Sequence, residues 1–254
     1  MDTRNYISLG YYITRRCDTS KVGGFWKEQK PGADRVLPDL IVSTSSCLAE
    51  FIPDSWCIKW ADGPFVEENY DERLELFNVV KGKALQMAAE ATKRFDKDFV
   101  WPNVWFGLDQ PRQFIHEYLA NDPKRALLGL GIDGSNLGLF LKLTSPPPQE
   151  PGFGQVAAPG VHSAAAAHRS MASGGKVIGY EVRNCDRSYG SLSCSWLCNG
   201  LHVDMWQKFG IGVNENGLFN SYGDAVNCVN YIRLPTTGAE PGEWFPLVVV
   251  QYDE

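Results

Sequence analysis

Hydrophobic residues recur every second position in some segments of the chain, as in β-strands, and every three to four positions in others, as in α-helices. Residues Tyr6 to Thr14 are rich in Tyr and Ile and predict an opening β-strand. Further strands are predicted by short apolar runs at Asp39 to Thr44, Trp56 to Ala61, Lys176 to Arg183 and Trp244 to Tyr252. Pro246 limits the start of the last run to a sheet edge, because proline cannot donate to a strand ladder.

Helical spacing appears in the middle and near the end of the chain. The longest run, Glu68 to Phe95, contains no proline and predicts a long helix. A second helix is predicted from Asp109 or Gln110 until Asn121. Ser193 to Phe209 predicts an amphipathic helix in which Gly200 is a weak point.

The last predicted helix carries a recognisable start signal. Ser221 followed three residues later by Asp224 resembles a capping box. It precedes a run with apolar residues at Tyr222, Val229 and Ile232. This pattern predicts a helix that begins directly after Ser221.

Two apolar runs predict a β-hairpin near the centre of the chain. Arg125 to Ile132 and Leu137 to Leu143 are joined by Asp-Gly-Ser-Asn, a composition that favours a tight reversal. Gly129 to Gly134 also has the glycine spacing of a dinucleotide-binding loop. Such a loop has to leave a strand and open a helix. Since the second run has the pattern of a strand, the hairpin is the favoured interpretation.

Residues 146–175 have a different composition from the rest, rich in Pro, Gly and Ala. The pattern predicts a mobile surface excursion or linker with one helical turn between Val161 and Met171. The elements together predict an α+β fold, built as a single globular domain over residues 1–254. Its mixed or mainly antiparallel sheet is flanked by about four helices.

Composition narrows the functional classes. Hydrophobic residues make up 44% and charged residues 21% of the chain, as in ordinary globular proteins. The net charge of -6 disfavours nucleic acid as a partner and favours a basic protein. Seven irregularly spaced cysteines, without a signal-peptide pattern, indicate reduced thiols in the cytoplasm. No apolar window is long enough to span a membrane.

No residue pattern identifies a reaction, a metal or a cofactor. Cys194, Cys198 and His202 would lie along one helical stripe, but three ligands spread over about 12 Å cannot all bind one ion. A core role for these cysteines is therefore favoured. A hydrolase or transferase with a dispersed site, for example Cys198 and His202 together with Asp204, is one alternative function. A non-catalytic scaffold or adaptor that docks through residues 146–175 is another.

Acidic residues gather at the start of the longest predicted helix, where they complement its dipole. A solvated acidic face is favoured over a catalytic carboxylate pair, and this face is predicted to bind a basic partner. Exposed tryptophans would strengthen such a surface, and Trp26, Trp101, Trp105 and Trp206 lie near polar or loop segments. The predicted partner-binding residues are Glu67, Glu68, Tyr70, Asp71, Glu72, Glu75, Trp101 and Trp105.

The C-terminal third carries a resemblance to uncharacterised bacterial proteins. It rests on Val177-Ile-Gly-Tyr-Glu-Val182, Ser195-Trp-Leu-Cys-Asn199 and Gly217-Leu-Phe219, and covers about 80 residues. Some of these bacterial proteins look like immunity proteins that accompany polymorphic or secreted toxins. The resemblance implies a cytosolic inhibitor that binds and blocks a cognate toxin domain, without catalytic residues of its own.

Overall fold

The computed structural model describes residues 5–19, 37–44, 50–51, 99–100, 104–145, 159–186 and 191–253. The main strands are β1 (Tyr6–Arg15), β7 (Arg125–Asp133), β8 (Lys176–Asp186), β9 (Ser191–Ser195) and β10 (Glu243–Tyr252). Two-residue strands are β2 (Cys17–Asp18), β3 (Leu40–Ile41), β4 (Glu50–Phe51), β5 (Phe99–Val100) and β6 (Val104–Trp105). The helices are α5 (Asp109–Tyr118), α6 (Leu137–Thr144), α7 (Pro159–Ala166), α8 (Leu201–Phe209) and α9 (Tyr222–Ile232), with 3₁₀ turns η3 (Gly134–Asn136) and η4 (Trp196–Asn199).

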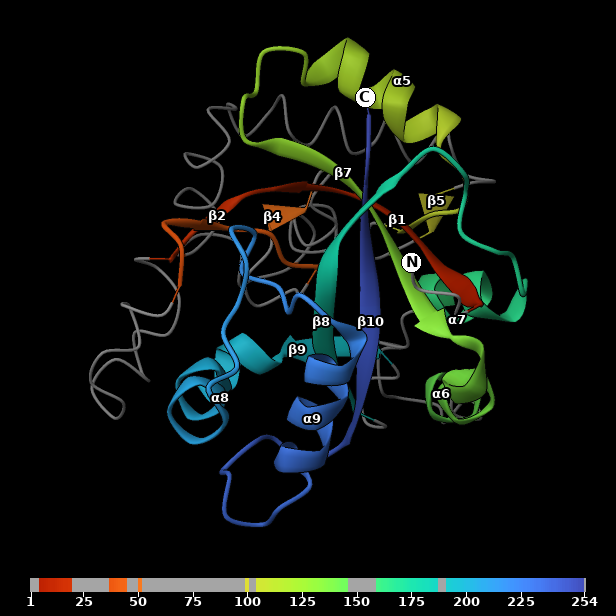
Figure 1. The fold of residues 1–254 in the computed structure, drawn as a ribbon. Helices are drawn as coiled ribbons and strands as arrows, with labels where there is room; N and C mark the ends of the chain where they lie inside the picture. The colour runs from red at the N-terminus through yellow and green to blue at the C-terminus, as the bar shows by residue number, and fades with distance from the viewer. Residues whose placement is uncertain are drawn as a thin grey trace, which may run out of the picture.

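One curled antiparallel sheet organises these elements (Figure 1). Its strand order is β5-β6-β1-β7-β10-β8-β9, with β4 also pairing with β1. Strands β2 and β3 form a separate pair. The predicted α+β fold with a mainly antiparallel sheet is confirmed.

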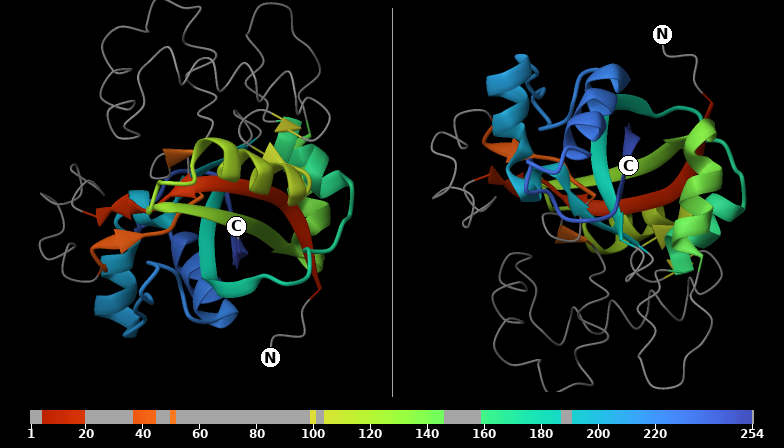
Figure 2. Two further views of the ribbon diagram at one scale, coloured as in Figure 1. Left: turned by 90° about the horizontal axis from the view of Figure 1, so that it is seen from above. Right: turned by 90° about the horizontal axis from the view of Figure 1, so that it is seen from below.

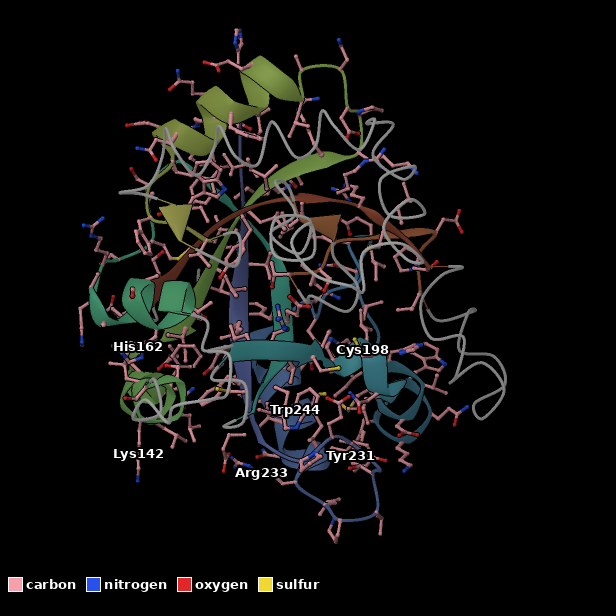
Figure 3. The ribbon with its side chains drawn as sticks, turned by 180° about the vertical axis from the view of Figure 1, so that it is seen from behind. Lys142, His162, Cys198, Tyr231, Arg233 and Trp244 are labelled. Atoms are coloured by element: carbon pink, nitrogen blue, oxygen red, sulfur yellow. The ribbon has the colours of Figure 1, made fainter. Side chains whose placement is uncertain are left out.

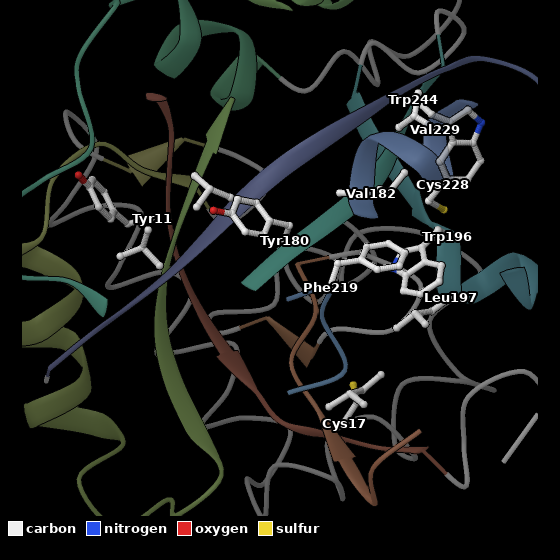
Figure 4. Close-up of a cluster of buried hydrophobic side chains, with 14 of the residues drawn as sticks. Tyr11, Cys17, Tyr180, Val182, Trp196, Leu197, Phe219, Cys228, Val229 and Trp244 are labelled. Carbon is white, nitrogen blue, oxygen red and sulfur yellow. The ribbon is translucent and has the colours of Figure 1, made fainter. Parts of the chain in front are cut away.

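Helices cover both faces of the sheet, so the strands contribute to two hydrophobic clusters. One cluster draws side chains from α5, α8 and α9, and its centre contains Trp196 stacked on Phe219 with ring centroids 4.1 Å apart (Figure 4). The other cluster draws side chains from α6 and α7. Figure 2 shows α8 and α9 grouped together, apart from α6 and α7. Burial on both faces explains why β7 and β10 are almost continuously apolar.

The closing strand β10 lies between β7 and β8 in the sheet, but its first residues pair on one side only, as the prediction of an edge at Pro246 requires. β10 pairs with β8 from Glu243 and with β7 only from Leu247. Pro246 is thus just ahead of the β7 ladder, where its missing N–H costs no bond to β7.

The predicted central hairpin is wrong, because residues after the turn form helix α6 instead of a strand. The side chain of Asp133 accepts a hydrogen bond from the Ser135 amide and starts η3, which continues into α6. Leu137, Phe140 and Leu143 are buried at helical spacing. The amphipathic period of a short helix therefore decides the structure of this run.

The predicted helix from Ser193 to Phe209 exists only in its second half. Strand β9 reaches Ser195, whose hydroxyl caps the turn η4 through the Leu197 amide. Gly200 then adopts a left-handed conformation with φ of 63°, and α8 begins at the next residue. The glycine that the sequence marked as a weak point is the break between two elements.

The predictions of α5 and α9 are confirmed. α5 has Pro111 in its first turn, where no helical N–H is required. α9 begins after Ser221, whose Oγ accepts a hydrogen bond from the Asp224 amide at 3.1 Å and donates one to Asp224 Oδ2 at 2.7 Å. This reciprocal cap satisfies an amide that the helix itself leaves without a partner.

Replacing Ser221 by alanine is expected to lower the free energy of unfolding by about 1 kcal/mol, because the Asp224 amide loses its acceptor. Urea unfolding of the variant measures the loss. Ser221→Asp, which restores a cap acceptor, should recover most of it. Equal losses in both variants would contradict the capping role.

Part of the predicted excursion is packed into the fold. Residues 146–158 lie outside the described residues. In the remainder, Val161, Ala164 and Ala165 of α7 are buried, and Ser170 forms a β-bridge with Ile7 of β1. Residues 159–175 therefore belong to the folded domain, and small alanine side chains let α7 approach the sheet closely.

Other predicted elements, the strand at Trp56 to Ala61 and the helix at Glu68 to Phe95, also lie outside the described ranges. Within those ranges, no helix has the length and apolar character needed to cross a bilayer.

Candidate protein-binding surface

Large apolar side chains are exposed where α8 and α9 end. Trp206 is 53% exposed, and Phe209 and Leu234 are each 51% exposed. Trp206 and Phe209 are three residues apart on α8, so they lie on neighbouring positions of one helix side. Leu234 follows α9 and donates its amide to the Tyr231 carbonyl. We call the exposed rings of Trp206 and Phe209, together with the Tyr231 ring on which Phe209 packs, the α8–α9 aromatic surface.

Contacts beneath this surface fix its geometry. The ring of Phe209 meets that of Tyr231 edge to face, with centroids 5.4 Å apart. Lys208 Nζ lies 4.7 Å from the Tyr231 ring centroid and donates a hydrogen bond to its hydroxyl, which raises the pKa of Lys208. Gly210, with φ of 65°, ends α8. The exposed rings are thus carried by a capped helix joined to α9 by aromatic packing.

The sequence around the surface is acidic. Residues 201–243 contain five carboxylates and two cations, a net charge of -3 from a chain total of -6. Arg233, at the end of α9 beside Tyr231 in Figure 3, has Nη2 3.9 Å from Glu243 Oε2. Lys208 is held over Tyr231. Asp204 interacts electrostatically with Lys208, and Glu215, Asp224 and Glu240 are the other carboxylates of this stretch, whose net negative charge favours a basic partner.

Of the partner-binding residues predicted from the sequence, only Trp105 lies within the described residues. Glu67, Glu68, Tyr70, Asp71, Glu72, Glu75 and Trp101 lie outside the described residues. Trp105 is completely buried in β6, with its ring 5.8 Å from that of Phe114. Its prediction as an exposed binding residue is wrong, because the indole supports the packing of α5 on the sheet.

Cys198, His202 and Asp204, the residues of the dispersed-site alternative, belong to two different elements. Cys198 is in η4, ahead of the left-handed break at Gly200, whereas His202 and Asp204 are in α8. Two residues apart on a helix, His202 and Asp204 point to different sides. His202 is buried with its ring centroid 6.4 Å from that of Trp196. It belongs to the core packing around Trp196.

The other chemical motifs also have structural roles. Cys194 ends up in β9, so the predicted helical stripe of Cys194, Cys198 and His202 does not form. Among the residues that the structure describes, no group of three or more His, Cys, Asp or Glu side chains is arranged to hold a metal ion.

The dinucleotide-like motif does precede a helix, but its first two glycines, Gly129 and Gly131, lie inside β7, and only Gly134 lies in the turn η3. A Cβ on Gly129 would be 2.8 Å from Met171 Cε, and one on Gly131 would be 2.9 Å from Met171 Sδ. β7 is also antiparallel to both neighbouring strands. These glycines therefore make room for Met171 within the sheet layer and do not form a phosphate-binding turn.

A buried polar cluster on β8 was not predicted from the sequence. Glu181 is buried, and its carboxylate accepts hydrogen bonds from Ser43 Oγ at 2.7 Å and from Thr44 N and Oγ1 at 3.1 and 2.8 Å. Arg183, also buried, donates to Thr44 Oγ1 at 2.7 Å and to the Leu192 carbonyl. Burial raises the pKa of the neighbouring Tyr12. We call Glu181, Arg183, Ser43 and Thr44 the β8 polar cluster.

The β8 polar cluster joins three parts of the chain. Its hydrogen bonds attach residues 43 and 44 to β8, and Arg183 attaches β8 to β9. The carboxylate and the hydroxyls satisfy each other inside the protein, so the geometry supports a structural clasp.

In comparisons with known proteins, no protein family model, curated protein or solved structure matches this chain. The exposed aromatic surface therefore carries the functional argument.

Proposed function

We propose that this protein is a cytosolic immunity-type inhibitor, which binds a basic toxin domain through the α8–α9 aromatic surface. The observation that carries the proposal is the exposure of about half of Trp206 and Phe209 on a well-packed helix. An immunity function is also what the sequence motifs of the C-terminal third were expected to indicate. Both features lie in the same part of the chain.

Two properties make these side chains suitable binding anchors. Trp and Tyr are enriched among interface residues that contribute most to affinity, because they bury a large area with few rotatable bonds. Phe209 packs on Tyr231, which is buried in the hydrophobic cluster and therefore held in place. The surface is therefore preorganised, and binding would order few additional side chains.

The negative charge of this part of the chain favours a partner with a basic surface. The net charge of -3 over residues 201–243 attracts a basic surface and raises the rate of encounter, while the aromatic anchors determine how long the complex lasts. Toxin domains that act on nucleic acid or nucleotides present basic surfaces of this kind. Binding should therefore weaken as salt increases, mainly through slower association.

Replacing Trp206 by alanine is expected to weaken partner binding about 30-fold, equivalent to about 2 kcal/mol, and Phe209→Ala is expected to have a similar effect. The tagged protein and both variants would be used to capture proteins from the native cell lysate at low and high salt, together with the products of adjacent genes. Affinity for the captured chain is then measured by calorimetry.

Leu139→Ala is the matched control, because Leu139 is also exposed, at 43%, but lies on α6. It should leave affinity unchanged. The proposal further requires that the captured chain is toxic when expressed alone and harmless when expressed with this protein. A non-toxic partner would contradict the inhibitor function, and undiminished binding by Trp206→Ala and Phe209→Ala would contradict the surface.

A further inference from the structure

The connection between α7 and β8, residues 167–175, crosses the outer edge of β1 (Figure 2). We call it the 167–175 strap. The Ser8 amide donates to the Arg169 carbonyl at 2.8 Å, and the Met171 amide donates to the Tyr6 carbonyl at 3.4 Å. Ser170 completes a β-bridge with Ile7. The strap thus pairs with the start of β1 as a short additional strand.

Two phenols hold the next peptide unit of the strap. Tyr11 Oη accepts a hydrogen bond from the Ala172 amide at 3.0 Å, and Tyr252 Oη donates one to the Ala172 carbonyl at 3.0 Å. The two rings meet edge to face with centroids 5.5 Å apart. Tyr11 is on β1 and Tyr252 on β10, so they attach the strap to the two strands that flank β7.

Met171 supplies the long apolar side chain that anchors the strap to this face. Its Cε and Sδ lie over Gly129 and Gly131, where any larger residue of β7 would clash. The side chain is partly buried and packs against the cluster that contains Tyr252. Strap residues 167–170, 173 and 174 are exposed. Met171 therefore adds an apolar contact with the two glycines of β7 to the hydrogen bonds that hold the strap.

We propose that Met171 is an oxidation-sensitive latch, and that conversion of its thioether to a sulfoxide releases the 167–175 strap from β1. The sulfur packs against Gly131, where an added Cβ would meet both Met171 Sδ at 2.9 Å and Val248 Cγ1 at 2.8 Å. A sulfoxide adds a polar oxygen and a stereocentre to this sulfur, which disrupts apolar packing.

The chemical step requires a peroxide as the oxidant. A lone pair of Sδ attacks one peroxide oxygen, the O–O bond breaks as the S–O bond forms, and the other oxygen leaves as water after proton transfer. The sulfur is oxidised by two electrons, and the peroxide is reduced by two. Met171 is partly accessible to such a reagent, whereas Met205 in α8 is completely buried.

The test is to treat the full chain with hydrogen peroxide, map oxidised peptides by mass spectrometry, and follow amide hydrogen exchange. Met171 should be oxidised before Met205. The Ser8 and Ala172 amides, which bond to the strap and to Tyr11, should then exchange at least about tenfold faster, while central β10 amides keep their protection.

Met171→Leu retains the apolar side chain without the oxidisable sulfur, so its exchange should not respond to peroxide. Met171→Gln should accelerate exchange at the same amides without any oxidant. Unchanged exchange after full oxidation of Met171 would overturn the latch, as would an equal peroxide response in Met171→Leu. Acceleration across all strands in Met171→Gln would also overturn it, because release would then be global unfolding.

Discussion

Replacing Glu181 by alanine is expected to lower the free energy of unfolding by about 3–5 kcal/mol. The carboxylate is buried and accepts hydrogen bonds from Ser43 and from both the amide and the hydroxyl of Thr44. Its removal takes the acceptor from these donors and leaves the buried Arg183 guanidinium without the negative charge of the cluster. Unsatisfied buried groups retain their full desolvation cost, so the losses accumulate.

Urea unfolding followed by tryptophan fluorescence measures this loss, and Glu215→Ala provides the matched control. Glu215 is an exposed glutamate, and its replacement should change the free energy of unfolding by no more than about 0.5 kcal/mol. If Glu181→Ala were as mild as Glu215→Ala, the β8 polar cluster would not be the clasp between residues 43–44 and β8.

The burial of Glu181 could not be predicted from the sequence. Along β8, Glu181 and Arg183 alternate with the apolar Tyr180 and Val182, a pattern typical of a strand with one solvated face. Both faces of β8 are in fact covered, so the polar positions are buried. The partners, Ser43 and Thr44, are more than 130 residues away in sequence. No local pattern can connect residues that far apart.

Elements with a complete local signal were predicted correctly. β1, α5 and α9 have a run rich in Tyr and Ile, a first-turn proline and a capping box respectively, and tertiary structure agrees with each signal. The run from Leu137 to Leu143 was predicted wrongly, because seven residues rich in Leu fit the period of a strand as well as that of a helix. Its helix depends on the turn that Asp133 starts. Local patterns therefore predict elements best where a specific start residue accompanies the period.

The candidate surface was predictable only in part. Trp206 was identified as a tryptophan near polar segments, and it is exposed; Trp105, selected by the same criterion, is buried. The difference arises from packing, since α5 places Phe114 against Trp105. Exposure of Phe209 depends on Gly210, which ends α8 directly after it. Sequence proximity to polar residues does not distinguish these cases.

Replacing Gly10 by alanine is expected to lower the free energy of unfolding by about 2–5 kcal/mol, because strain and overpacking act together. Gly10 has φ of 104°, a conformation that alanine rarely adopts, within the irregular register between Ser8 and Tyr11. A Cβ here would be 2.3 Å from Val104 Cγ1 and 3.3 Å from the Trp105 carbonyl oxygen. Relief would require β6 to move away from β1.

Gly138→Ala separates this effect from the general consequence of removing a glycine. Gly138 lies in α6, is exposed and has open space around its Cβ position. Alanine there should stabilise the protein by up to about 1 kcal/mol, since it favours the helix. If Gly10→Ala lowers the free energy of unfolding and Gly138→Ala raises it, the loss at Gly10 comes from its backbone conformation and its contact with Val104. A neutral Gly10→Ala would mean that β6 can move away from β1 at little cost, contrary to the close packing of Val104 and Trp105.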